Sequence, residues 1–143
     1  MDNYLNMKFL SIPENVSFAR STVSAFCIAM DPSIEEINDV KTAVSEAVTN
    51  CIVHGYENKK TEIIEISATC KNNEVEIEIV DNGVGIPDVK RAMEPFFTTK
   101  PNEERSGMGF TIMQTFMDEI SVESKEGETR VKMKKIFKGN SNV

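Results

Sequence analysis

The chain has 143 residues, of which 40% are hydrophobic and 27% are charged, and its formal net charge is −7. This length predicts one compact domain over residues 1–143, since it suffices for a continuous core but not for two. The negative charge would repel a phosphate backbone, which argues against direct nucleic-acid binding and favours a basic protein partner. An apolar run long enough to span a bilayer and a secretory signal are both missing, so we expect a cytoplasmic protein that is not attached to a membrane.

The first third of the chain predicts a short strand and two helices. Residues 7–12 form the candidate strand, and Pro13 suits the opening of a helix that Asp31-Pro32 ends. Ser33 and Glu36 have the spacing of a capping box, which predicts the start of a second helix. Its apolar residues recur at helical spacing, and they are Ile37, Val40, Val44, Ala47, Val48 and Cys51.

Four further segments predict strands. Residues 62–70 are rich in isoleucine and threonine, and residues 74–80 alternate glutamate with valine or isoleucine, so we expect a hairpin that turns at Asn72-Asn73. Two more strands, around residues 120–124 and 129–136, are expected to follow a helix that runs through Phe110, Met113 and Met117. They meet at a turn containing Gly127. The pattern predicts an antiparallel-rich sheet covered by helices.

A long segment between Asp81 and Gly107 has no regular pattern and contains three prolines. Loops of this length inside a compact domain are usually functional lids. The polar C-terminal tail, residues 138–143, is expected to fray.

Glu46 and Asn50 lie one turn apart on the second helix, on the side that faces away from its aliphatic residues. A solvated helix face would explain either residue alone. Alternatively both face a cleft, where the Asn50 amide oxygen can bind Mg²⁺ and the Glu46 carboxylate can accept a proton. His54, the only histidine, is interpreted as a helix-end residue because Gly55, a natural helix terminator, follows it.

The strand that ends at Asp81 is followed by Gly83 and Gly85. Glycines let a backbone approach a ligand where a side chain would collide, although an ordinary turn would explain them equally well. The Asp81 carboxylate could accept a hydrogen bond from an amino group such as that of adenine.

The segment from Ser106 to Phe110 opens a predicted helix, whose exposed N–H groups would form a phosphate site. Lys100 and Arg105 add positive charge nearby. A helix preceded by an ordinary loop is the alternative. The spacing fits neither a Walker loop nor a dinucleotide fingerprint.

The order of these motifs resembles the GHKL superfamily of ATPases and kinases, which unites DNA gyrase, the Hsp90 chaperone, histidine kinases and MutL. Four segments point to one branch of this superfamily, and they are VSEAVTN (44–50), HGY (54–56), PFFTTKP (95–101) and ERSGMGFTIM (104–113). In these segments the chain resembles the serine kinases that double as anti-sigma factors, most closely the anti-sigma F factors of spore-forming bacteria. The resemblance extends from about Phe9 to Met133.

The resemblance implies a fold and a set of site residues. The fold would be an α/β (α+β) two-layer sandwich of the Bergerat type, with a mixed, mainly antiparallel sheet covered by helices on one face and ATP under a lid at about residues 88–106. Glu46 would be the general base, Asn50 would hold Mg²⁺, and Asp81 would bind the adenine amino group. The other nucleotide-binding residues implied are Gly83, Gly85, Thr99, Lys100, Arg105, Ser106, Gly107, Met108, Gly109, Phe110 and Thr129. Glu128 stands where relatives commonly have glycine, which leaves the role of Thr129 open.

The resemblance also implies the partners. The protein would hold a sporulation sigma factor, sigma F, away from RNA polymerase, and with Mg-ATP it would phosphorylate and inactivate an anti-anti-sigma protein. ADP would be the product, a homodimer is expected, and Arg20 on the first helix would belong to the partner surface. The alternatives are a general-stress-type anti-sigma kinase, a histidine-kinase-like catalytic domain, a gyrase-like or chaperone-like ATPase, and a binding protein that keeps ATP as a structural ligand.

Overall fold

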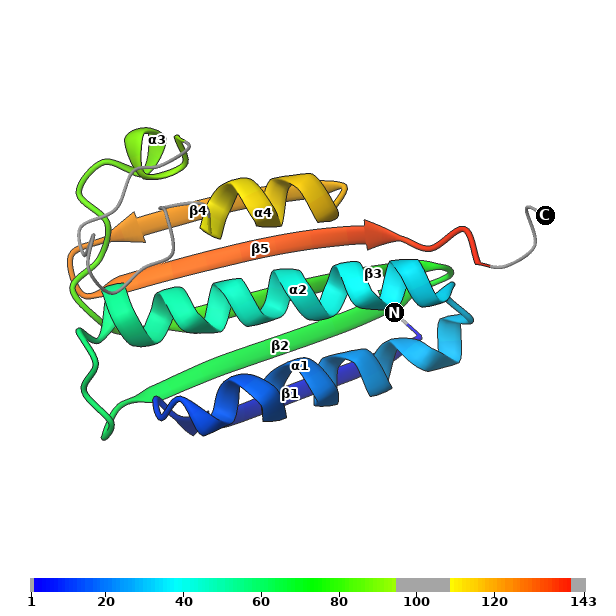
Figure 1. Cartoon of the computed structure of the whole chain (residues 1–143), viewed down its shortest axis with the longest axis horizontal. Helices are drawn as coiled ribbons and strands as arrows, with labels where there is room; N and C mark the ends of the chain where they lie inside the picture. The colour runs from blue at the N-terminus through cyan, green and yellow to red at the C-terminus, as the bar shows by residue number, and fades with distance from the viewer. Residues whose placement is uncertain (1, 95–108, 140–143) are drawn as a thin grey trace.

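The computed structural model describes residues 2–94 and 109–139. Five strands form one sheet in the order β1-β2-β3-β5-β4, every pairing among these strands is antiparallel, and helices cover one face (Figure 1). The expected two-layer fold class is therefore confirmed, except that the sheet formed by the described strands is antiparallel throughout and not mixed. The elements are β1 (Asn3–Leu10), α1 (Glu14–Cys27), a 3-10 turn (Ile28–Met30), α2 (Ile34–Asn50), a π-helical turn (Cys51–Gly55), β2 (Ile63–Lys71), β3 (Glu74–Asp81), α3 (Val89–Ala92), α4 (Gly109–Phe116), β4 (Glu119–Lys125) and β5 (Glu128–Ile136).

The first strand begins earlier than the sequence pattern predicts, at Asn3 instead of residue 7. It pairs along its whole length with β2, from Asn3 opposite Cys70 to Leu10 opposite Ile63. The strand ends at Leu10 because Ser11 turns inward, where it is fully buried and its hydroxyl donates to the Lys59 carbonyl at 2.6 Å. Pairing with β2, and not local alternation alone, sets these limits.

The predicted capping box is present at the start of α2. The Ser33 hydroxyl accepts from the Glu36 N–H at 3.1 Å, and the Glu36 carboxylate accepts from the Ser33 N–H at 2.9 Å. The same carboxylate also accepts from the backbone N–H groups of Lys138, at 2.7 Å, and Gly139, at 3.0 Å. Glu36 therefore anchors the chain after β5 to α2, and this anchor includes the first two residues of the tail that was expected to fray.

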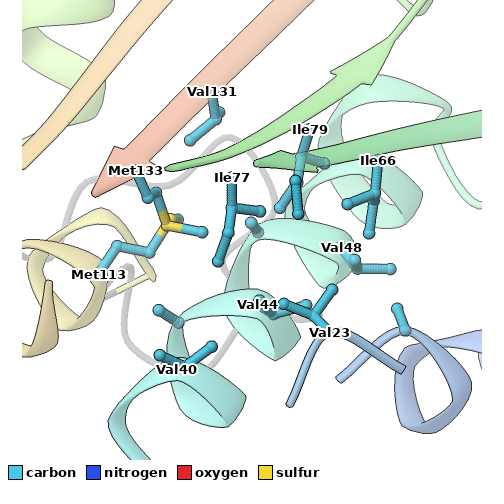
Figure 2. Close-up of a cluster of buried hydrophobic side chains, with 14 of the residues drawn as sticks. Val23, Val40, Val44, Val48, Ile66, Ile77, Ile79, Met113, Val131 and Met133 are labelled. Carbon is cyan, nitrogen blue, oxygen red and sulfur yellow. The ribbon is translucent and has the colours of Figure 1, made fainter. Parts of the chain in front are cut away.

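The core lies between the inner face of the sheet and the helices α1, α2 and α4 (Figure 2). Inward residues of β3 and β5 face the apolar side of α2, as their alternation in the sequence predicts. On the opposite face of the sheet, glutamates of β3 pair with lysines of β5, and such exposed ion pairs contribute little to stability. The core residues labelled in Figure 2 are Val23, Val40, Val44, Val48, Ile66, Ile77, Ile79, Met113, Val131 and Met133.

Within residues 2–94 and 109–139, no helix combines the length and the apolar composition that crossing a bilayer requires.

Replacing Glu36 with glutamine should lower the free energy of unfolding at pH 7 by about 1 kcal/mol, because the capping box and the tail anchor both lose a charged acceptor. Burial raises the pKa of Glu36, but backbone hydrogen bonds from Lys138, Ser33 and Gly139 outweigh it and lower the pKa below 4.5. The stabilisation is complete above pH 4.5 and is lost as the pH falls through the lowered value. Denaturant titrations of wild type and Glu36→Gln should therefore converge in acid.

Glu35→Gln provides the matched control, since Glu35 lies in the same turn of α2 and is exposed. At pH 7 the Glu35→Gln substitution should lower the free energy of unfolding by less than Glu36→Gln does. Equal losses for the two variants would contradict the anchoring role of Glu36.

Candidate functional site

Four elements and one loop meet at the end of the molecule where α2 finishes (Figure 1). They are the π-helical turn after α2, the last residue of β3, the loop at residues 82–88, the turn between β4 and β5, and the start of α4. The sequence-predicted residues Glu46, Asn50, Asp81, Gly83, Gly85, Gly109, Phe110 and Thr129 belong to these elements or adjoin them. The predicted residues Thr99, Lys100, Arg105, Ser106, Gly107 and Met108, and the part of the predicted lid after Glu94, lie outside the described residues.

Gly55 does not simply terminate α2. The helix continues through a π-helical turn, in which the Tyr56 N–H donates to the Cys51 carbonyl at 2.8 Å. A Cβ atom on Gly55 would lie 2.6 to 2.8 Å from the atoms of the Asp81 carboxyl group. The absence of a side chain at Gly55 therefore lets the end of the α2 segment touch Asp81. Sequence reasoning missed this contact, although Gly55 stood in the HGY segment that carried the resemblance.

Asp81 is a buried acceptor, with 3% of its surface exposed. Its carboxylate accepts from the Gly83 N–H at 3.0 Å and from the Cys51 thiol. Burial raises the pKa of Asp81 above its ordinary value, and these two hydrogen bonds partly oppose the rise. A carboxylate held in this environment is suited to accept a hydrogen bond from an amino group.

The loop after Asp81 is fastened to fixed partners on both sides. The Asn82 N–H donates to the Tyr56 hydroxyl at 2.7 Å, the Val84 N–H to the Gly55 carbonyl at 2.9 Å, and the Ile86 N–H to the Ser124 hydroxyl at 2.6 Å. The loop therefore holds its shape through the protein's own hydrogen bonds. Tyr56 and Ser124 were not predicted as site residues, and their hydroxyls reach the loop from other segments of the chain.

The two glycines of the loop are required by contacts with the protein itself. A Cβ on Gly83 would lie 1.9 Å from the Gly55 carbonyl oxygen, and one on Gly85 would lie 2.3 Å from the Lys125 carbonyl oxygen. Gly85 also has a φ of +80°, which glycine adopts readily. The sequence suggested that these glycines let the backbone approach a ligand. The structure shows that they also let it approach the neighbouring Gly55 and Lys125 carbonyl groups.

Thr129 lies directly opposite Asp81 in the pairing of β3 with β5. Its side chain is on the inner face with 6% of its surface exposed, and its hydroxyl lies 2.9 Å from that of Ser124. The neighbouring Glu128 carboxylate lies 3.6 Å from the Arg130 guanidinium. Thr129 therefore keeps its place beside Asp81 while Glu128, the residue before it, pairs with Arg130.

Glu46 and Asn50 are half-buried on α2, so neither is a fully solvated surface residue. A Cβ on Gly109 would lie 3.0 Å from Nδ2 and 3.1 Å from Oδ1 of Asn50. The Asn50 amide thus lies against the first residue of α4, where backbone N–H groups begin a helix. Phe110, the next residue, packs against the core. Among the described residues, no three histidine, cysteine, aspartate or glutamate side chains gather into a metal site.

The comparisons with known proteins agree with this arrangement. Residues 9–135 match a family described as the histidine kinase-like ATPase domain. An anti-sigma F factor of Clostridium botulinum is 58% identical over 137 residues, which are 95% of this chain and 96% of the relative. This chain belongs to the anti-sigma F factor family. A family member from a Thermoanaerobacter species is likewise 58% identical over 134 residues, 93% of each chain.

Solved structures with low sequence identity share the fold. The RsbU and RsbW domains of a Mycobacterium tuberculosis protein match with a TM-score of 0.67 at 14% identity, over 94% of this chain and 32% of that one. The catalytic domain of the histidine kinase ThkA matches with a TM-score of 0.59 at 16% identity, over 94% of this chain and 97% of that one. The family and its histidine kinase-like ATPase fold are thus established by independent comparisons.

We expect Asp81→Asn to raise the melting temperature of the nucleotide-free protein at pH 7 by about a few degrees. The raised pKa of Asp81 means that folding disfavours the charged carboxylate. This penalty is absent below the ordinary pKa of 3.8 and complete above the raised value, so the gain should shrink as the pH falls toward 3.8. Thermal melts of wild type and Asp81→Asn between pH 3.8 and pH 7 measure this difference in melting temperature.

Asp31→Asn is the control for the Asp81 substitution. Asp31 is exposed and has a φ of 53°, a conformation that asparagine also tolerates, so its melting temperature should not change. An Asp81→Asn protein that melts well below the wild type at pH 7 would contradict the assigned penalty.

Proposed function

We propose that this member of the anti-sigma F factor family is an anti-sigma factor that is also a protein-serine kinase. It binds a sigma factor of the F type, and it uses Mg-ATP to phosphorylate a serine of an anti-anti-sigma protein, which inactivates that antagonist. The observation that supports the proposal is that Asn50 lies against the start of α4 and the buried Asp81 lies against Gly55, in a chain that is 58% identical to an anti-sigma F factor.

The adenine end of the nucleotide lies against Asp81. The Asp81 carboxylate accepts a hydrogen bond from the adenine amino group. Thr129 lies beside Asp81 on β5, and Gly83 and Gly85 border the base. The loop that carries these glycines already has its hydrogen bonds satisfied within the protein, so nucleotide binding need not order it.

The phosphate end lies between α2 and the start of α4. Asn50 supplies an amide oxygen, a hard ligand of the type that Mg²⁺ prefers, and it lies against Gly109. Bound Mg²⁺ would neutralise phosphate charge. The N–H groups at Gly109 and Phe110 bind phosphate oxygens. Further phosphate contacts by Thr99, Lys100, Arg105, Ser106, Gly107 and Met108 remain predictions from the sequence.

Glu46 lies one helical turn before Asn50 and acts as the general base. It takes the proton from the serine hydroxyl as the serine oxygen attacks the γ-phosphorus, and the bond to the β,γ-bridging oxygen breaks to release ADP. Phosphoryl transfer depends mainly on positioning and charge neutralisation, so a correctly placed carboxylate suffices.

A histidine-kinase activity on this chain is disfavoured by its single histidine. His54 lies in the π-helical turn beside the nucleotide site, half-buried and engaged with a neighbour. We expect a phosphoacceptor histidine to lie on an element separate from the nucleotide site, and His54 does not. The similarity to histidine kinases therefore concerns the fold.

The partner surface includes α1 and the lid. Figure 1 places the first turns of α1 at the same end of the molecule as the C-terminal end of α2, and Arg20 lies on this helix. A positive side chain there offers a contact for an acidic patch on a sigma factor or an anti-anti-sigma protein. A homodimer through β1, the strand at one end of the sheet order, remains part of the proposal.

Glu46→Gln should reduce serine phosphorylation by about 10²- to 10⁴-fold, because glutamine cannot take the hydroxyl proton. ATP affinity should change little. The measurements are transfer of radiolabelled phosphate from ATP to the anti-anti-sigma protein and calorimetric titration with ATP. Glu35→Gln, at the far end of the same helix, controls for the loss of one negative charge. Undiminished labelling of the anti-anti-sigma protein by Glu46→Gln would show that Glu46 is not the general base.

Arg20→Ala should weaken binding of at least one protein partner about tenfold, the typical effect of losing one interfacial charge. Titration of the variant with a sigma F factor and, separately, with an anti-anti-sigma protein measures this. Lys71→Ala removes the same charge from an exposed position at the end of β2 and should have no effect. Wild-type affinity of Arg20→Ala for both partners would exclude α1 from the partner surface.

A further inference from the structure

We propose that Ser124 is a positioning residue that sets the base specificity of the nucleotide site. It accepts the hydroxyl hydrogen of Thr129, so that the Thr129 oxygen acts only as an acceptor toward the base. The inference rests on the proposed function, since it assumes that the base lies against Asp81 and Thr129. It concerns a residue of β4 that no sequence motif singled out.

Ser124 joins three segments through one oxygen atom. It lies opposite Thr129 in the pairing of β4 with β5, half-buried on the inner face of the sheet. Its hydroxyl accepts from the Ile86 N–H at 2.6 Å, lies 2.9 Å from the Thr129 hydroxyl, and donates to the Glu128 carbonyl at 3.2 Å. The loop after Asp81 and the hairpin that carries Thr129 are therefore held by a single side chain.

The number of hydrogens on these groups decides the direction of each bond. A serine hydroxyl has one hydrogen to donate and two lone pairs to accept with. The Ile86 N–H can only donate and the Glu128 carbonyl can only accept. All three bonds form together in one arrangement, in which Ser124 donates to Glu128 and accepts from both Ile86 and Thr129.

This arrangement commits the only hydroxyl hydrogen of Thr129 to Ser124. Both lone pairs of the Thr129 oxygen then remain able to accept, on the residue that lies opposite Asp81 in the pairing of β3 with β5. Two acceptors side by side favour a base whose edge carries an amino group, directly or through a bridging water, over one that carries a carbonyl oxygen. Without Ser124 the Thr129 hydroxyl can turn and donate, so a carbonyl-bearing base is tolerated better.

The test compares ADP with inosine diphosphate, whose base has a carbonyl group in place of the adenine amino group. Calorimetric affinities are measured for wild type, Ser124→Ala, Ser124→Thr, which keeps the hydroxyl, and Ser121→Ala. Ser121 lies on the same strand and is exposed, on the opposite face, so it is the matched control. Melting of each nucleotide-free variant verifies that it is folded.

In Ser124→Ala the preference for ADP over inosine diphosphate should fall about tenfold, the equivalent of one net hydrogen bond. Ser124→Thr and Ser121→Ala should keep the wild-type preference. A Ser124→Ala protein that keeps the wild-type preference for ADP over inosine diphosphate, whether its two affinities stay the same or fall together, would overturn the proposal. A wild-type protein that binds neither nucleotide would instead refute the proposed function.

Thr129→Val keeps the proposal testable if Ser124→Ala does not fold. Valine has nearly the shape of threonine without the hydroxyl, and it leaves the bond from Ile86 to Ser124 in place. The same loss of base preference is expected, and an unchanged preference would show that Ser124 does not act through Thr129.

Discussion

The contact between the Gly55 backbone and the Asp81 carboxyl group is the constraint on which the site depends. It brings the end of the α2 segment against the end of β3, and it is open only to a residue without a side chain. The π-helical turn supplies the necessary displacement, since it widens the helix just before Gly55. The Gly55 carbonyl then accepts from Val84, so the same residue also holds the loop that follows β3.

A second consequence of this contact is electrostatic. Asp81 is enclosed by the π-helical turn, the loop and β5, and its burial raises the pKa of the carboxyl group. The protein thus keeps a group whose charged form opposes folding, and a ligand that donates to this carboxylate recovers part of that free energy. Groups whose pKa is shifted by burial are common at functional sites. Stability elsewhere comes from the apolar core and from anchors such as Glu36.

Local patterns predicted most of the elements. The capping box at Ser33 fixed the start of α2, and Asn72, which has a φ of 57°, turns between β2 and β3 as expected for asparagine. Alternation along β3 predicted which of its residues are buried, because side chains on a strand alternate between faces. The limits of β1 were predicted less well, since a strand at the end of a sheet extends as far as its neighbour offers partners.

The sequence by itself determined the order of the motifs, the face of α2 that carries Glu46 and Asn50, and the family. The tertiary structure decided which residues meet: Gly55 with Asp81, and Ser124 with Ile86. It also placed Thr129 opposite Asp81, because β5 lies between β3 and β4 and not at the edge of the sheet. Strand order and these side-chain bonds depend on how distant segments pack, and periodicity along the chain holds no information about that.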